Sequence, residues 1–250
     1  MRHSGFNIGL VAIAVMPATM SSASALDLTI QPRVTIGAQY YEYNVAGASD
    51  VNAEVDYVFG GLGVTGQIGS FFVDLYGQTN LTEGEDDNPN IGGGRETTVD
   101  RSEINLTAGF AATRNITLFG GLKYARNEID SEFGNGVTID IETDYFGPFG
   151  GLALTFPFSD VGALSLNGSV AYLDGEETVD NSLLVSDVVN DGNALGYAVG
   201  LGWSGRFGPA TSALGYGIGI DYSTYDFEES GDDEFKEETA RLRGEVKYRF

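Results

Sequence analysis

The sequence predicts an all-β fold, a transmembrane antiparallel up-and-down β-barrel of about ten strands, with eight or twelve strands as alternatives. Three observations predict it. Apolar residues recur at every second position over stretches of roughly ten residues, which is the period of a strand. The connections between these stretches alternate between short and long. The 250 residues include 36 glycines, 13 tyrosines and 15 phenylalanines but no cysteine, which fits a folded β protein better than a disulfide-rich scaffold.

The first residues predict an export signal. Arg2 precedes an apolar run over residues 8–16, and a stretch of small residues ends at Ala25. A transmembrane helix needs about 18 or more apolar residues, so the shorter run indicates a signal peptide that is cleaved after Ala25. The sequence therefore divides into a signal peptide, residues 1–25, and one outer-membrane barrel domain, residues 26–250.

Ten candidate strands emerge when clusters of Gly, Pro, Asn and Asp are treated as turns. They lie near residues 32–44, 55–68, 70–82, 99–113, 116–129, 141–157, 162–174, 194–207, 212–227 and 239–250. The tight connections are 69–70, 114–115, 157–161 and 208–211, and the long acidic ones are 45–54, 83–98, 130–140, 175–193 and 228–238. This alternation is typical of bacterial outer-membrane barrels, and an even number of strands puts both mature termini on the periplasmic side.

The last strand shows the alternation clearly. Leu242 and Val246 lie on one face, whereas Arg243 and Lys247 lie on the other. A soluble sandwich would bury the apolar face in a core. A membrane barrel would turn it to lipid and keep the charged face in the lumen.

The C-terminus also carries a resemblance. The alternating Val246, Tyr248 and Phe250, which end the chain on an aromatic residue, resemble the C-terminal assembly signal of Gram-negative outer-membrane proteins. Together with the alternating hairpins, the chain resembles the small porin-like outer-membrane barrels. The resemblance implies the bacterial outer membrane as the location, and outer-membrane lipids, lipopolysaccharide and the barrel-assembly machinery as partners.

Most basic residues of the mature chain are predicted to lie in the lumen. A charged side chain is energetically costly on the lipid-facing side of a strand. The alternation of side chains along each strand therefore predicts that its charged residues lie on the inward face. The predicted lumen charges are Arg33, Asp74, Arg101, Glu103, Lys123, Arg206, Asp221, Arg241, Arg243, Glu245, Lys247 and Arg249. Two interpretations stay open: basic and acidic groups interlock as a polar plug, or a basic, water-filled lumen passes small anions.

Several function classes are disfavoured. The net charge of −23 repels phosphate backbones, so nucleic acid is not an expected partner. Residues 61–66 and 200–205 match the G-x-G-x-x-G pattern but do not open a helix, so no nucleotide cofactor is expected. The acidic loops lack the spacing of a Ca²⁺ loop. A solvated acidic surface is therefore favoured over loose binding of divalent cations that bridge to lipopolysaccharide.

Catalysis is also disfavoured. Known outer-membrane barrel enzymes, such as the omptin-type proteases, characteristically use a histidine with Ser, Asp or Glu. The only histidine here is His3, which belongs to the predicted signal peptide. The mature chain then has no imidazole to serve as a general base, so the sequence predicts no enzyme.

Two functions remain. The first is a narrow porin-like channel for small solutes with a preference for anions, because the predicted lumen charge is mostly basic. The alternative is a non-conducting surface-structural or adhesion barrel that acts through its acidic extracellular loops. Small solutes are the further partners of the first function, and divalent cations are those of the second.

The signal peptide gives the first testable prediction. Cleavage after Ala25 leaves Leu26 as the mature N-terminus, because small residues occupy the positions that signal peptidase reads. The intact mass of the protein purified from membranes should match residues 26–250. A purified product that retains Met1 would contradict the prediction.

Overall fold

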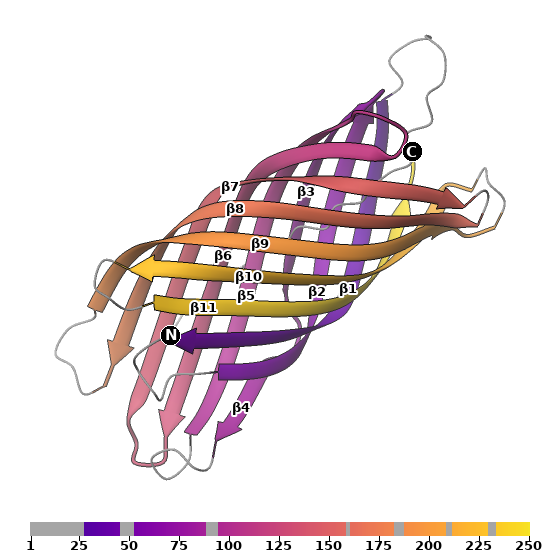
Figure 1. The fold of residues 1–250 in the computed structure, drawn as a ribbon. Coiled ribbons are helices and arrows are strands. Elements are labelled where there is room, and N and C mark those ends of the chain that lie inside the picture. The colour runs from indigo at the N-terminus through magenta and orange to yellow at the C-terminus, as the bar shows by residue number, and fades with distance from the viewer. Residues whose placement is uncertain are drawn as a thin grey trace.

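The computed structural model describes residues 28–45, 53–88, 95–158, 161–182, 188–208, 212–229 and 234–250. Within these ranges the chain forms a closed antiparallel β-barrel without a helix (Figure 1). Its strands are β1 Leu28–Val45, β2 Ala53–Ile68, β3 Phe71–Asn80, β4 Gly84–Asn88, β5 Arg95–Ala111, β6 Ile116–Phe133, β7 Thr138–Phe158, β8 Gly162–Asn181, β9 Val188–Arg206, β10 Leu214–Glu229 and β11 Glu234–Tyr248.

Each strand pairs with its neighbours in the chain, and β1 pairs with β11 to close the barrel. The short β4 is the one irregularity among these strands. β3 pairs with β5 from Phe71↔Phe110, and β4 pairs with the other half of β5 from Gly84↔Val99. β3 and β4 thus form one barrel strand that is interrupted at residues 81–83. The barrel therefore has ten strands, which confirms the predicted fold class.

The two ends of the barrel differ. We call the end where β1 begins and β11 ends the terminal end, and the opposite end the distal end. At the terminal end the turns are short, as between β2 and β3, where Gly69 has a φ of 57° that favours glycine. In Figure 1 the C label marks the terminal end at the upper right.

Every barrel strand changes polarity along its length, as β6 shows. Near the terminal end Leu118 and Leu122 point outward and are about half exposed, at 52% and 44%. Farther along, the outward positions carry charges such as Arg126 and Glu128, while Ile129 points inward and is buried. Nine residues of a strand span roughly 30 Å, about the thickness of a bilayer core. The apolar outer band, residues 116–124 in β6, therefore matches one membrane crossing.

The distal half is a water-facing barrel with an apolar core. Tyr41, Tyr43, Tyr145 and Phe227 are buried inside it. Aromatic rings meet there in close contacts, and Phe227 stacks on Phe235 with ring centroids 4.2 Å apart. The interior of this half is thus closed by side chains in the way that a soluble core is closed.

The strands continue beyond the apolar outer band, which corrects the predicted strand bounds. Two connections predicted at 130–140 and 175–193 are mostly strand, since β6 reaches Phe133, β7 starts at Thr138, β8 reaches Asn181 and β9 starts at Val188. Their outward positions carry Asp, Glu and Thr, so the segments look like loops in sequence. The apolar residues have moved to the inward face instead.

Some predictions fall outside the described residues. The predicted signal peptide, residues 1–25, lies there entirely, as do parts of the predicted connections 45–54, 83–98 and 228–238. In the part of the chain that the structure describes, no helix is long and apolar enough to cross a membrane. That finding has no bearing on strands.

The polarity change predicts a position-dependent cost of charge on β10. Ile218 is 57% exposed within the apolar band, so Ile218→Arg should lower the free energy of unfolding by about 2–4 kcal/mol. Asp226 is exposed on the same face but beyond the band, so Asp226→Arg should change it by about 0–1 kcal/mol. Urea unfolding in lipid vesicles measures both. Equal losses in the two variants would contradict the assignment of the membrane-facing band.

Candidate functional site

The lumen is the candidate site, because that is where the charged side chains of the terminal half point. Eight of the predicted lumen charges are buried: Arg33, Asp74, Arg101, Glu103, Lys123, Arg241, Arg243 and Glu245. Asp221 and Lys247 are half-buried. Arg206 ends β9 and is exposed, and Arg249 is exposed beyond the end of β11. The last two therefore lie at the mouth of the terminal end.

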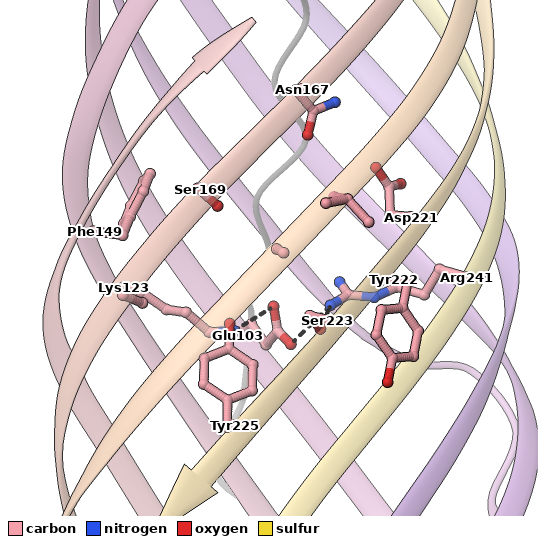
Figure 2. A pocket seen from close by; sticks show the side chains of 13 residues that line it. Glu103, Lys123, Phe149, Asn167, Ser169, Asp221, Tyr222, Ser223, Tyr225 and Arg241 are labelled. Carbon is pink, nitrogen blue, oxygen red and sulfur yellow. Dashed lines mark hydrogen bonds and ion pairs between the residues drawn. The ribbon is translucent and has the colours of Figure 1, made fainter.

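A central ion cluster joins opposite walls of the barrel. We define it as Arg101, Glu103, Lys123, Glu237 and Arg241, which come from β5, β6 and β11. Arg101 Nη2 lies 2.9 Å from Glu103 Oε1, and Arg101 Nη1 lies 2.6 Å from Glu237 Oε1. Lys123 Nζ and Arg241 Nη2 lie 3.6 and 3.7 Å from the Glu103 carboxylate. Figure 2 shows Lys123 and Arg241 reaching Glu103 from opposite sides.

Neutral side chains complete the central ion cluster. Asn127 accepts a hydrogen bond from Arg101 at 2.8 Å and donates one to Glu237 at 3.0 Å. Lys123 donates to the hydroxyl of Tyr225 at 2.8 Å. Removing one partner of a buried ion pair leaves the other charge unpaired at a cost of about 3–5 kcal/mol, so this arrangement strongly resists rearrangement.

Two further ion groups lie nearer the terminal end. Arg33 binds Asp74 with two parallel contacts of 2.6 and 2.8 Å, and the Thr65 hydroxyl donates to the same carboxylate. On the neighbouring strands β10 and β11, Arg243 Nε lies 2.6 Å from Asp221 Oδ2. Glu245 joins this second group through Arg243 Nη1, at 3.7 Å, and Lys247 Nζ lies 3.1 Å from Glu245 Oε1. Each of these groups balances its own charge.

Glu237 is the functional residue that the sequence prediction missed. It lies in the predicted connection 228–238, although it is fully within β11 and 1% exposed. The inward-facing buried residues Arg95 and Glu177 were missed for the same reason. A usable signal was present, because Glu237 continues the odd-numbered parity of Arg241 and Arg243.

A small cavity lies against the central ion cluster. Its volume is about 60 Å³, and Asn167, Ser169, Ala171 and Ala198 form one wall (Figure 2). These short side chains leave room that a larger residue would fill. Gly200 adds to it, since a Cβ there would lie 2.4 Å from Asp221 Oδ1. In the residues that the structure describes, no group of carboxylates and imidazoles is arranged to hold a metal ion.

The outer face of the distal half carries mixed ion pairs on an acidic background. Arg126 contacts Glu142 at 2.6 Å and Glu128 at 2.9 Å. Hydrogen bonds from Tyr222 and Lys236 lower the pKa of Glu238. These groups are solvent-exposed, so each pair contributes little to stability. Their main effect is on the surface potential.

The residues of the predicted assembly signal lie on the outside at the terminal end. Val246, Tyr248 and Phe250 are all exposed, and the rings of Tyr248 and Phe250 are 4.8 Å apart. The backbone N–H of Phe250 donates to Ile30 at 3.0 Å, so the last residue is tied to the first strand.

Comparison with known proteins identifies the fold. No protein-family model and no curated protein sequence matches the chain. Among solved structures, the outer membrane protease OmpT from Escherichia coli has a TM-score of 0.65 at 12% identity, covering 92% of this chain and 100% of that one. The β domain of the Bordetella autotransporter BrkA has a TM-score of 0.51 at 12% identity, covering 88% of this chain and 99% of that one.

The translocator domain of the autotransporter NalP from Neisseria meningitidis is also similar, with a TM-score of 0.50 at 13% identity and 88% of each chain covered. Identities this low show a shared fold and nothing finer. OmpT is an outer-membrane protein by its description, and the apolar outer band of this chain fits the same setting. The chain thus has the fold of the small outer-membrane β-barrels of Gram-negative bacteria.

Proposed function

We propose that this protein is a non-conducting outer-membrane barrel that displays a rigid acidic surface outside the cell, and that it is not an enzyme. The observation that carries the proposal is the filled interior. The central ion cluster crosses the lumen, and the aromatic core of the distal half covers it. Both layers are built from side chains that are almost completely buried.

A porin-like channel needs a continuous water-filled path. Here Glu103, Tyr41 and Phe59 are each 0% exposed, although they point into the barrel. Ten strands enclose a lumen only slightly wider than the eight-stranded kind that side chains just fill. The interlocked plug is therefore favoured over the basic, open lumen.

The outer face of the distal half supports a role at the cell surface. The acidic side chains that point outward there are Glu42, Glu54, Asp56, Glu85, Glu96, Asp100, Glu128, Asp130, Glu132, Asp140, Glu142, Asp144, Asp174, Glu176, Asp180, Asp191, Asp226 and Glu238. Arg126 and Lys236 are the basic side chains on the same described surface. Because these groups lie on paired strands, their spacing is fixed by the sheet.

This surface selects partners by charge. It attracts divalent cations and basic protein surfaces and repels nucleic acid and other anionic polymers. In the outer leaflet the same face would meet anionic lipopolysaccharide, with divalent cations between the two. Outer-membrane lipids cover the apolar band, and the exposed Val246, Tyr248 and Phe250 are the contacts that we assign to the barrel-assembly machinery.

The orientation of the barrel in the membrane follows from the difference between its two ends. We place the terminal end in the periplasm and the distal half outside, because short turns and termini are periplasmic in bacterial outer-membrane barrels. The charges agree with this placement, since Arg114, Arg206 and Arg249 are the exposed charged side chains that the structure describes near the terminal mouth. A basic mouth would face the inner leaflet, while the acidic half would project from the cell.

Absence of catalysis is the remaining part of the proposal. OmpT is a protease by its description, but the likeness to it is one of fold. The single histidine of this chain is His3, within the predicted signal peptide. Glu103, Asp221, Glu237 and Glu245 in the lumen each lie against a basic side chain, which disfavours a role as a general base.

Planar-bilayer recording tests the sealed lumen. The purified mature protein should give no conductance steps at either polarity. The triple variant Tyr41→Ala, Phe227→Ala and Arg101→Ala removes large side chains from both the distal core and the central ion cluster, and it should give steps. Tyr172→Ala is the matched control, because Tyr172 is 53% exposed on the outer face, and it should stay silent.

Heat-modifiable electrophoretic mobility checks that each protein is folded before recording. Anion-selective steps from the unaltered protein would overturn the sealed barrel and restore the narrow channel. The basic excess of the central ion cluster is the observation that would then account for the selectivity.

A further inference from the structure

One strand edge in the distal half of the barrel is not paired with a second strand. β2 pairs with β3 only from Phe59↔Asn80 onward, whereas β4, which continues β3, pairs with β5. Within the described part of the chain, residues 53–57 of β2 therefore pair on one side only, with β1. We call the other side of these residues the β2 edge. An unpaired edge presents backbone N–H and C=O groups that can pair with another strand.

The β2 edge exists because β4 is shifted relative to β3. The last pair of β3 with β5 is Thr79↔Ser102 and the first pair of β4 is Gly84↔Val99, so residues 80–83 lie opposite residues 100 and 101 alone. Such a bulge bends its strand and disrupts the ladder locally. β4 approaches β2 at Gly84, where a Cβ would lie 2.9 Å from Val55 Cβ. No ladder of hydrogen bonds joins these two described strands.

The interrupted strand caps only the first position before the β2 edge. The carbonyl oxygen of Val58 accepts a hydrogen bond from the N–H of Leu81 at 2.7 Å, and the N–H of Val58 donates to the Thr82 hydroxyl at 2.9 Å. Backbone groups of alternate residues point to the same side of a strand, so those of Asp56 and Glu54 point the same way as those of Val58. They are the groups of the β2 edge that a further strand would bind.

The side chains along the β2 edge are acidic and exposed. Glu54 and Asp56 point outward on β2, Glu83 lies in the interruption, and Glu85 points outward on β4. Within the described residues, no basic side chain forms an ion pair with these carboxylates. Continuing the register of β2 and β3 would place Glu83 opposite Asp56 and Glu85 opposite Glu54. Like charges directly opposite are destabilising, whereas Lys or Arg at these positions would be attracted.

We propose that the β2 edge binds an extended basic peptide segment of another protein, which adds to the sheet as a further strand at the border of the membrane-facing band. Its backbone pairs with Asp56 and Glu54, and its Lys or Arg side chains lie beside the two carboxylates. Val58 and Leu81 are 38% and 60% exposed next to the β2 edge and provide an apolar contact at one end. β4 is held by its ladder to β5, so the seam can widen without loss of a ladder to β2.

Charge distinguishes this partner from two other occupants. A second copy of this chain would bring its own Glu54 and Asp56 against the same residues, which places acid against acid. The segments next to β2 and β4 in the sequence, residues 46–52 and 89–94, contain no Lys or Arg. The inference rests on the acidic surface of the proposed function and is independent of the sealed lumen.

The first experiment uses a synthetic eight-residue peptide of alternating Lys and Thr as the probe. The mature protein in lipid nanodiscs should bind it, and amide hydrogen exchange at Glu54 and Asp56 should slow. The matched control is the same peptide N-methylated at each Lys, which keeps the charge but removes the N–H groups that would face β2. It should bind more than tenfold more weakly, because several hydrogen bonds are lost.

Equal affinity for the two peptides would overturn the inference and leave the acidic surface intact, since charge alone would then account for binding. Absence of binding by either peptide would contradict both the inference and the attraction of basic partners. Conductance of the unaltered protein would contradict only the sealed lumen.

The second experiment compares two variants at one position. Asp56→Ala and Asp56→Pro both remove the carboxylate, but only Asp56→Pro removes the N–H, which faces away from β1. Peptide affinity should be about fivefold lower in Asp56→Pro than in Asp56→Ala, which is the effect of one hydrogen bond. Equal affinities would contradict strand addition. Asp226→Ala changes an exposed carboxylate on β10 and should bind the peptide as the unaltered protein does. If Asp56→Pro does not fold, the N-methylated peptide still decides.

Discussion

The fold depends on one constraint. The outer face of each barrel strand contacts lipid over one half of its length and water over the other half. Charged side chains are costly in lipid, so in the terminal half Leu, Ile and Val point outward and the charged side chains point inward. Water reverses the preference, so the distal half turns Asp and Glu outward and its aromatic residues inward. In β6 the change falls between Tyr124 and Arg126, which are successive outward positions. The strand itself continues without a break.

This reversal also determines what fills the lumen. Inward charges in the terminal half must find partners, and they do so across the barrel, from β5 and β6 to β11. Inward apolar side chains in the distal half must find each other, as Phe227 and Phe235 do. The two kinds of interior meet at the central ion cluster, where Arg101 lies over the ring of Tyr41 at 5.2 Å.

The same reversal explains which parts were predictable from sequence. Apolar residues at every second position mark the outer faces of the strands that contain Arg33, Glu103 and Arg241. This alternation was enough to predict the fold class. The same alternation predicts that a strand ends where its apolar face ends. Glu237 and the distal parts of β7 and β8 were lost there, because their outward residues are as polar as a loop. Pairing across the lumen depends on strand stagger, which single-sequence periodicity does not contain.

The closed lumen and the acidic surface are then two consequences of the same residue pattern in the distal half of the strands. A strand that continues into water must place its apolar residues inward, and ten such strands bring enough side-chain volume together to close a narrow barrel. The outward positions are left to polar residues, and here they are mostly Asp and Glu. A channel of this width would need polar inward positions over the full strand length. This chain instead has Tyr41, Phe59 and Tyr145 there, so the features that extend the barrel outside the membrane are the ones that close it.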